Sequence, residues 1–151
     1  MARVVSIAYT PGDVERRPAD HCARVPVERA TVVEQRGNFG DMKGTGGNRQ
    51  LNVMRAETLA EVAAEGRKTG PGEMGEQLVI AGLDPADPVQ GTRLRLGAEV
   101  VIEIGKPREP CERFAHIQET TIASGIGRIG VLARVVAGGG IAVGDEVTTI
   151  T

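Results

Sequence analysis

Apolar and polar residues alternate over many short stretches of the chain. The clearest example is 92–96, Thr-Arg-Leu-Arg-Leu, where a period of two places every second side chain on one face of a strand. Glycines separate such stretches at short intervals, which favours many short strands over βαβ units. The pattern predicts strands over Arg3–Ala8, Ala30–Gln35, Gln50–Met54, Gln77–Ala81, Arg93–Leu96, Glu99–Ile104, Gly130–Ala137 and Glu146–Ile150.

One stretch has a helical pattern instead. Residues Arg55–Glu65 are rich in strong helix formers, and a glycine follows them as a stop signal. Their spacing places Leu59, Val62 and Ala63 on one helix face. A second, shorter helix is predicted over Glu112–Gln118.

Three glycine-containing segments predict turns. Leu96–Glu99 is expected to form a tight hairpin, because glycine adopts the positive φ that such turns require. Gly138–Gly140 and Val143–Asp145 are expected to be two further turns. Because strands outnumber helices, we expect a mainly β fold: a closed or nearly closed β-barrel with one or two short helices, since closure removes exposed strand edges.

Length and composition narrow the possibilities. The 151 residues fit a single domain over 1–151. Aromatic residues make up 2% of the chain and the net charge is -2, so the stacking platforms and positive field of nucleic-acid binders are missing. No apolar run approaches the ~20 residues that span a bilayer, and no signal peptide is evident. We expect a cytoplasmic protein with neither nucleic-acid nor membrane partners, and with both cysteines as free thiols.

A possible dinucleotide-binding motif and a possible zinc-ligand set are both rejected because the surrounding sequence does not fit them. Gly125–Gly130 spells GxGxxG, but a dinucleotide site needs a helix directly after the glycines, and Val131–Val136 is β-like. A four-ligand zinc site would require paired spacings such as C-x-x-C, and these are missing from the candidate set. That set is His21, Cys22, Cys111 and His116.

Cys111 is the strongest candidate for a reactive group. It lies in Lys106–Arg113 (KPREPCER), where two prolines flank Arg108-Glu109 and make the exit from a strand stiff. The three cations of this segment outnumber its two glutamates, and nearby cations favour the nucleophilic thiolate. The alternative is a buried cysteine that packs as a small apolar residue.

A second candidate is the glycine-rich stretch Arg36–Gln50. Successive main-chain N–H groups in such a stretch can point into one concavity, and Lys43, Asn48 and Arg49 add donors that suit a phosphate. The alternative is an ordinary surface loop.

Several short pieces follow one another in a characteristic order along nearly the whole chain. They are Gly40-Asp41, Gly47-Asn48-Arg49-Gln50, Gly72, Gly75-Glu76, Gly82-Leu83-Asp84, Gly91, Leu94, Gly97, Glu103, Pro107-Arg108 with Pro110-Cys111, Ala133-Arg134-Val135, Gly138, Ile141 and Gly144-Asp145. In this order they resemble the MOSC domain, named for the C-terminal region of molybdenum-cofactor sulfurases. Two places depart from the family: Gln77 stands where Asn is frequent, and Met42-Lys43 where a basic residue and His are frequent.

The resemblance implies a barrel whose surface groove holds the molybdenum cofactor, molybdopterin, or handles sulfur for a metal centre. It places the family's cysteine at Cys111, as catalytic residue and as metal ligand, since a thiolate is both a nucleophile and a soft ligand. The cofactor-binding residues would be Lys43, Gly47, Asn48, Arg49, Glu76 and Arg108. The resemblance includes no desulfurase domain, so we expect no pyridoxal phosphate on this chain.

Three functions remain open at this point. The first is a carrier that receives sulfur as a persulfide on Cys111 from a pyridoxal-phosphate-dependent cysteine desulfurase, as a sulfurtransferase does. The second is a molybdenum-dependent reductase of N-hydroxylated compounds that takes electrons from partner proteins. The third is a β-barrel interaction module without chemistry.

Overall fold

Seven strands close into a ring in the computed structural model, which describes residues 1–9, 24–33, 37–38, 51–84 and 89–150. The elements, in chain order, are β1 Ala2–Tyr9, β2 Val25–Val27, β3 Arg29–Val33, β4 Gly37–Asn38, β5 Leu51–Arg55, α1 Ala56–Ala64, β6 Leu78–Ala81, β7 Arg93–Leu96, β8 Val100–Pro107, α2 Glu112–Gln118, a 3-10 turn Ala123–Gly125, β9 Val131–Ala137, β10 Gly139–Ala142 and β11 Glu146–Ile150.

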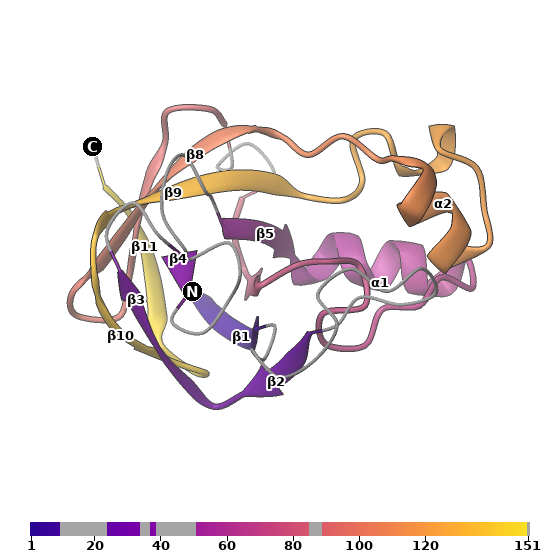
Figure 1. The fold of residues 1–151 in the computed structure, drawn as a ribbon. Helices are drawn as coiled ribbons and strands as arrows, with labels where there is room; N and C mark the ends of the chain where they lie inside the picture. Colours follow the sequence, from indigo (N-terminus) through magenta and orange to yellow (C-terminus); the bar gives the residue numbers. More distant parts are fainter. Residues whose placement is uncertain (10–23, 34–36, 39–50, 85–88, 151) are drawn as a thin grey trace.

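The ring is the closed β-barrel that the strand pattern predicts. Its order is β11-β7-β8-β9-β5-β6-β1, and β1 pairs back onto β11 through Ala2↔Val147 and Arg3↔Glu146. β2 continues the sheet beyond β1, and a separate sheet has the order β10-β3-β4. Figure 1 shows β3 and β10 at one end of the molecule and α2 at the other.

Alternation along the strands builds the barrel interior. In β7 the exposed Arg93 and Arg95 alternate with the buried Leu94 and Leu96, as the pattern of 92–96 predicts. The larger core cluster contains only apolar side chains, drawn from the barrel strands, from β3 and β10, and from Leu83 just after β6. Burial of this aliphatic surface is therefore the main favourable term for the barrel.

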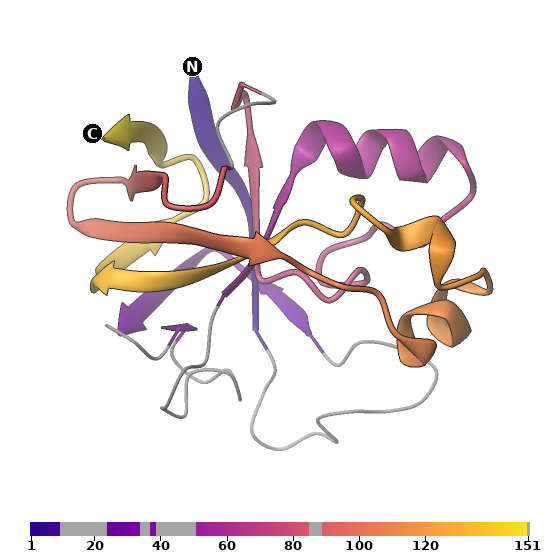
Figure 2. The ribbon, with the colours of Figure 1, turned by 90° about the horizontal axis from the view of Figure 1, so that it is seen from above.

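One crossover departs from the sequence prediction. β5 and β6 are parallel, with Val53↔Leu78 and Arg55↔Ile80 in register, and α1 contacts both strands. Parallel neighbours require such a crossover, so the predicted helix and its two flanking strands form a βαβ unit, which the glycine spacing did not favour. Figure 2 shows α1 and α2 on the same side of the barrel.

The helices match their predicted positions closely. α1 begins one residue after the predicted start and ends one residue before the predicted end, ahead of Gly66, whose φ is +88°. Val62 is buried and Leu59 packs beside it, but Ala63 is exposed, so its predicted place on the inner face is wrong. Ala63 and Ala64 at the end of α1 are both exposed, so the small core covers Leu59 and Val62 and does not extend to the end of the helix. α2 spans the predicted residues.

Of the three predicted glycine-containing turns, two are confirmed and one is wrong. Gly97 has φ +66° in the β7–β8 hairpin, and the Asp145 N–H donates to the Ala142 carbonyl at 3.1 Å in the predicted 143–145 turn. Gly139 and Gly140 do not form a turn, because they belong to β10 and pair with Val32 and Thr31. Local glycine content marked them as a turn, whereas pairing with a distant strand determines their structure.

A strand follows the GxGxxG segment directly. A dinucleotide site would need a helix there, so the structure agrees with rejecting this motif. β9 begins at Val131, directly after Gly130, whose φ is +86°. A Cβ at Gly130 would collide with the main-chain oxygen of Val53. This glycine therefore serves the close approach of β9 to β5.

Candidate functional site around Cys111

Cys111 lies on the surface immediately before α2. Its side chain is exposed, and its main chain is extended, with φ −134° and ψ 179°. The thiol makes no capping hydrogen bond to the helix. The alternative of a buried structural cysteine is therefore wrong, and the sulfur atom is accessible to a partner molecule.

Arg108 anchors the chain on the N-terminal side of Cys111. Its Nη1 donates to the carbonyls of Ile129 at 2.8 Å and Met74 at 3.1 Å, and its main-chain N–H donates to the Gly130 carbonyl at 3.0 Å. The half-buried guanidinium thus joins the exit of β8 to two other loops. The predicted stiffness of this exit depends on these bonds as well as on the flanking prolines.

The loop that Arg108 reaches is a tight turn held by Glu76. The two Glu76 carboxylate oxygens accept the N–H groups of Gly72 at 2.7 Å and Met74 at 3.1 Å, and the side chain is 1% exposed. Burial raises the pKa of Glu76, although these hydrogen bonds and the charge of Arg108 oppose the shift. The carboxylate is committed to the main chain of the turn, and its contact with a cofactor stays a prediction.

Gln118 anchors the chain on the C-terminal side of Cys111. Its buried amide donates to the Lys68 carbonyl at 2.9 Å, the Glu73 carbonyl at 3.3 Å and the Met74 sulfur at 3.1 Å, and it accepts the Lys68 N–H at 2.7 Å. Sequence analysis missed this residue. Its partners lie 44 to 50 positions away, so no local pattern marks it.

The two anchors meet at one residue. The carbonyl of Met74 accepts a hydrogen bond from Arg108, and its sulfur accepts one from Gln118. The Met74 side chain also packs in a small apolar cluster with Val62 and Ile129, which Phe114 adjoins. We call the segment 107–118 and the segment 67–76 together the thiol platform. Both flanks of Cys111 are therefore fixed to the same buried turn, while the thiol itself is exposed.

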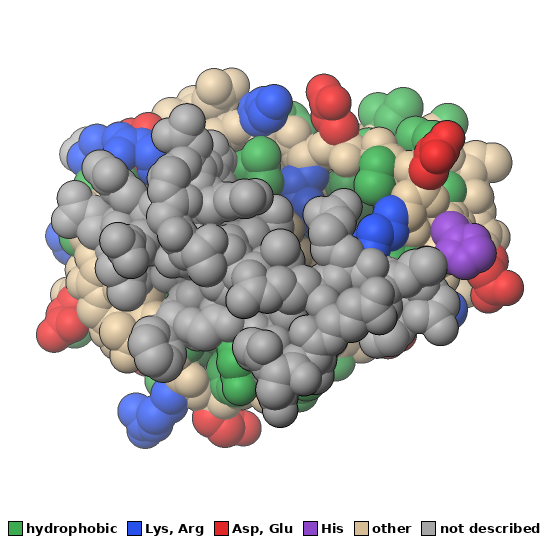
Figure 3. Space-filling model, viewed as in Figure 1, with side chains coloured by type: hydrophobic (Ala, Val, Ile, Leu, Met, Phe, Trp, Pro, Cys, Tyr) green, Lys and Arg blue, Asp and Glu red, His purple; other side chains and the backbone are tan. Residues whose placement is uncertain are grey.

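The surface beside the platform is mixed in character. Figure 3 shows acidic and basic side chains interspersed over the described part of that face, with hydrophobic side chains exposed near α2. Ile122 and Ile126, in the loop after α2, are 41% and 67% exposed. A Cβ at Gly125 would collide with Phe114 and approach Pro110, so this loop packs directly against the residue before Cys111.

The remaining predicted site residues lie outside the described residues. They are Lys43, Gly47, Asn48 and Arg49 of the glycine-rich stretch, together with His21 and Cys22 of the rejected zinc set. The structure therefore brings Arg108 and Glu76 together beside the Cys111 segment, and the placement of the glycine-rich stretch stays a prediction. His116 is exposed on α2.

Among the described residues, the Cys111 thiol is a donor that fits the metal of a molybdenum cofactor. An exposed thiolate is a suitable ligand for a soft metal. Within the described residues, no group of three or more His, Cys, Asp or Glu side chains is placed to hold a metal ion. Arg108 donates to the carbonyls of Met74 and Ile129, and Glu76 accepts N–H groups of its own turn. Contacts of Arg108, Glu76 and the stretch 43–49 with a cofactor stay predictions.

Known structures share this fold at low sequence identity. YiiM from Geobacillus stearothermophilus matches with a TM-score of 0.74 and 21% identity, over 100% of this chain and 76% of that chain. YiiM from Escherichia coli matches with a TM-score of 0.69 and 22% identity, over 99% and 70%. The YUAD protein from Bacillus subtilis matches with a TM-score of 0.74 and 13% identity, over 97% and 94%.

A match of the sequence to a family model assigns the chain to a family. No curated protein sequence matches the chain. None of the helices in the described residues is long and apolar enough to cross a membrane. Residues 34–148 match the family model of the MOSC domain, a range that includes the barrel strands from β5 to β9, the beginning of β11 and the whole thiol platform. The chain therefore belongs to the MOSC domain family.

Proposed function

We propose that the protein carries sulfur as a persulfide on Cys111 and delivers it to a metal-sulfur centre. The observation that supports this role is the combination of an exposed thiol and a segment anchored on both sides by Arg108 and Gln118. An exposed sulfur is reachable by a donor protein and by an acceptor in turn. Anchoring keeps the thiol in one place, so that less conformational entropy is lost at each encounter.

The loading step is a thiol–persulfide exchange. The Cys111 thiolate attacks the terminal sulfur of a persulfide on a cysteine desulfurase, and a new S–S bond forms on Cys111. The S–S bond of the donor breaks, its electron pair leaves on the donor cysteine as thiolate, and the transferred sulfur keeps its proton. The exchange needs no external oxidant or reductant, because the oxidation level moves with the sulfur atom.

The molybdenum cofactor is the group that we propose the protein binds, since the MOSC family is associated with it. Bound to the protein, it would supply a soft metal centre that accepts sulfur or a thiolate ligand. Cys111 would face that centre, and Lys43, Gly47, Asn48 and Arg49 would hold its phosphate. In the alternative of a molybdenum-dependent reductase, the same thiolate is a permanent metal ligand.

Mass spectrometry with metal analysis tests the proposal. After incubation with a cysteine desulfurase and cysteine, the intact protein should gain about 32 Da, the mass of one sulfur atom, on Cys111. Cys22→Ser is the matched control, because it leaves Cys111 as the single thiol of the chain and should load fully. Cys111→Ser should not load.

Two results would contradict the carrier function. One is full loading of Cys111→Ser, which would place the sulfur on Cys22. The other is stoichiometric molybdenum bound through Cys111 in protein from cofactor-competent cells, together with no persulfide after desulfurase treatment. That second result would support the reductase.

A further inference from the structure

Two isoleucines are exposed in the loop that follows α2. Ile122 is 41% and Ile126 is 67% exposed, and among the large apolar side chains that the structure describes, only Met1 at the N-terminus exposes a larger fraction than Ile126. Single exposed apolar side chains are common on protein surfaces. This pair has a special position, because its loop packs against the segment that carries Cys111.

The loop and the Cys111 segment meet at Gly125. A Cβ at Gly125 would lie 2.7 Å from the Phe114 ring and 3.0 Å from the Cβ of Pro110, the residue before Cys111. Together with the spacing of consecutive Cα atoms, this contact keeps the Cα atoms of Cys111 and Ile126 within about 14 Å of each other. Pro110 and Phe114 are only partly buried, so they add apolar surface between the thiol and the loop. We call four residues together the apolar rim: Pro110, Phe114, Ile122 and Ile126.

Hydrogen bonds hold the loop of the apolar rim in one shape. In its 3-10 turn, the Gly125 N–H donates to the Ile122 carbonyl at 3.1 Å. The Ser124 hydroxyl donates to the Thr121 carbonyl at 2.8 Å and accepts the Thr120 hydroxyl at 2.9 Å. A partner therefore meets a loop that is already ordered, and little conformational entropy is lost on docking.

Charges around the thiol do not favour a partner of either sign. Lys106 and Arg113 share the segment with Glu109 and Glu112. Figure 3 shows both signs interspersed over the described part of this face, with hydrophobic side chains exposed near α2. Burial of apolar surface is therefore the term that can hold a partner protein beside Cys111.

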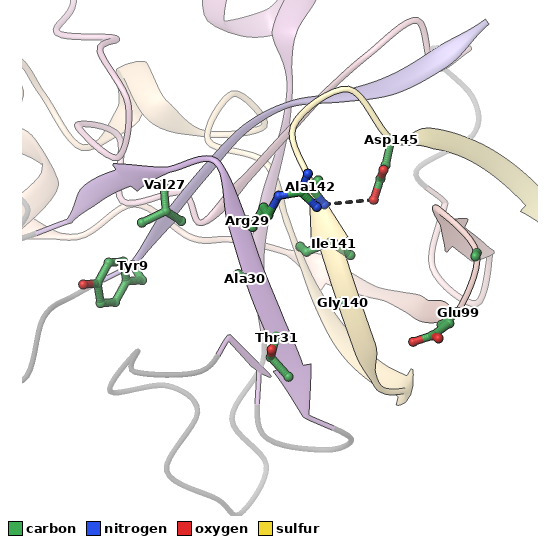
Figure 4. A pocket seen from close by; sticks show the side chains of 11 residues that line it. Tyr9, Val27, Arg29, Ala30, Thr31, Glu99, Gly140, Ile141, Ala142 and Asp145 are labelled. Atoms are coloured by element: carbon green, nitrogen blue, oxygen red, sulfur yellow. Dashed lines mark hydrogen bonds between the residues drawn. The ribbon is translucent and has the colours of Figure 1, made fainter.

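A cleft elsewhere on the molecule is too distant to serve this contact. It has a volume of about 780 Å³ and lies between β3, β10 and the β7–β8 turn (Figure 4). Figures 1 and 2 both place β3 on the far side of the barrel from α2. A protein seated in this cleft would not reach Cys111, so the cleft region supplies a control surface.

We propose that the apolar rim is the docking surface for the sulfur donor, a cysteine desulfurase whose persulfide cysteine lies on a loop with apolar flanks. The inference rests on the carrier function proposed above. Sulfur exchange requires the terminal sulfur of the donor to touch the Cys111 sulfur. A protein interface covers about 800 Å² on each partner, and a disc of that area has a radius of about 16 Å. A donor centred on the thiol therefore also covers Ile126.

Persulfide loading by two sulfur donors tests the proposal. A cysteine desulfurase with cysteine reaches Cys111 through protein contact, whereas glutathione persulfide is too small to need the rim. Ile126→Ser should raise the KM for the desulfurase about tenfold and leave kcat unchanged, because it removes apolar surface that docking buries. Ile122→Ser should raise KM by a smaller factor, because less of Ile122 is exposed. Neither variant should change the loading rate with glutathione persulfide.

Val143→Ser is the matched control. Val143 is 39% exposed, close to the value for Ile122, and it lies in the turn between Ala142 and Asp145, which both border the distant cleft. Removing this aliphatic side chain should change neither the KM for the desulfurase nor the loading rate with glutathione persulfide.

Three outcomes would overturn the docking surface. The first is an unchanged KM for the desulfurase in Ile126→Ser, and the second is an equal loss of loading with both donors, which would mean that the loop acts on the thiol itself. The third is a dimer of the natural chain that Ile126→Ser dissociates while KM stays the same, which would assign the rim to a second copy. If neither donor loads Cys111 of the natural chain, the carrier function fails and the docking surface fails with it.

Discussion

The barrel interior and the thiol platform are held together by different forces. The barrel core consists of apolar side chains, many of them with no exposed surface, such as Leu94 and Ile102. The platform has a small apolar cluster around Met74, supplemented by the buried polar side chains of Glu76 and Gln118. Apolar burial is non-directional and tolerates small shifts, whereas hydrogen bonds fix direction and distance. The barrel therefore supplies stability, and the platform supplies the position of one thiol.

The largest effect is expected from the barrel core. Ile102→Ala should lower the free energy of unfolding by about 3 kcal/mol, because it leaves a cavity at a position with no exposed surface. Urea unfolding followed by circular dichroism measures the change. At low temperature the folded fraction should still load sulfur on Cys111 at the natural rate. A large loss of loading in folded protein would show that the two regions are not separable.

A smaller effect on stability, but a larger one on the thiol, is expected at Gln118. Gln118→Met keeps the approximate shape of the side chain and removes its part-buried hydrogen bonds to the main chain of Lys68, which should cost about 1 kcal/mol. Amide exchange should accelerate over 67–76, and Cys111 should load more slowly. The exposed neighbour Glu119 provides the control, Glu119→Gln, which should change neither quantity. Unchanged loading in Gln118→Met would separate the anchor from the thiol.

The pH dependence of stability should have opposite signs in the two regions, beginning with Glu76. Burial raises the pKa of this carboxyl above its usual value of 4.5, so the folded protein holds this proton at pH values where the unfolded chain has lost it. The contribution of Glu76 to the free energy of unfolding should therefore fall as pH rises from 4.5 through the raised pKa. Urea midpoints of the natural chain and Glu76→Gln across this window measure the slope. A contribution that rises with pH would contradict the burial of the charge.

The smallest effect is expected on the outer surface of the barrel. Hydrogen bonds from Arg134 and Arg93 lower the pKa of Glu103 below 4.5, so its contribution is present above 4.5 and is lost as pH falls through the lowered pKa. Because the group is exposed, Glu103→Gln should change stability least of the four variants, and salt of about 1 M should reduce the difference further. A salt-insensitive loss as large as that of Ile102→Ala would mean that these charges support the core.

Local sequence patterns predicted most of the barrel because each strand carries its own period. The alternation in β7, the hairpin at Gly97 and the range of α2 are all properties of neighbouring residues. β2, β4 and β10 were missed for the opposite reason. Each has two to four residues and exists through pairing with a distant segment, as Gly139 does with Val32. The parallel pairing of β5 and β6 is likewise a consequence of the crossover and not of either strand alone.

The candidate site shows the same division. Cys111 was found because prolines and charges surround it in the sequence, and Arg108 was named as a cofactor-binding residue through the family resemblance. The structure added that Cys111 is exposed and that Arg108 binds the carbonyls of Met74 and Ile129. Glu76 was also named from the sequence, but its hydrogen bonds to Gly72 and Met74 assign it to the turn.

The sequence by itself determined the barrel class and the family and singled out Cys111 as the candidate reactive group, because hydrophobic period, glycine spacing and motif order are properties of neighbouring residues. Only the tertiary structure decided which polar groups meet. Arg108 and Gln118 reach the same turn, because strand pairing and helix packing bring distant segments within hydrogen-bond range. Such contacts depend on the closed sheet as a whole, so no local pattern encodes them.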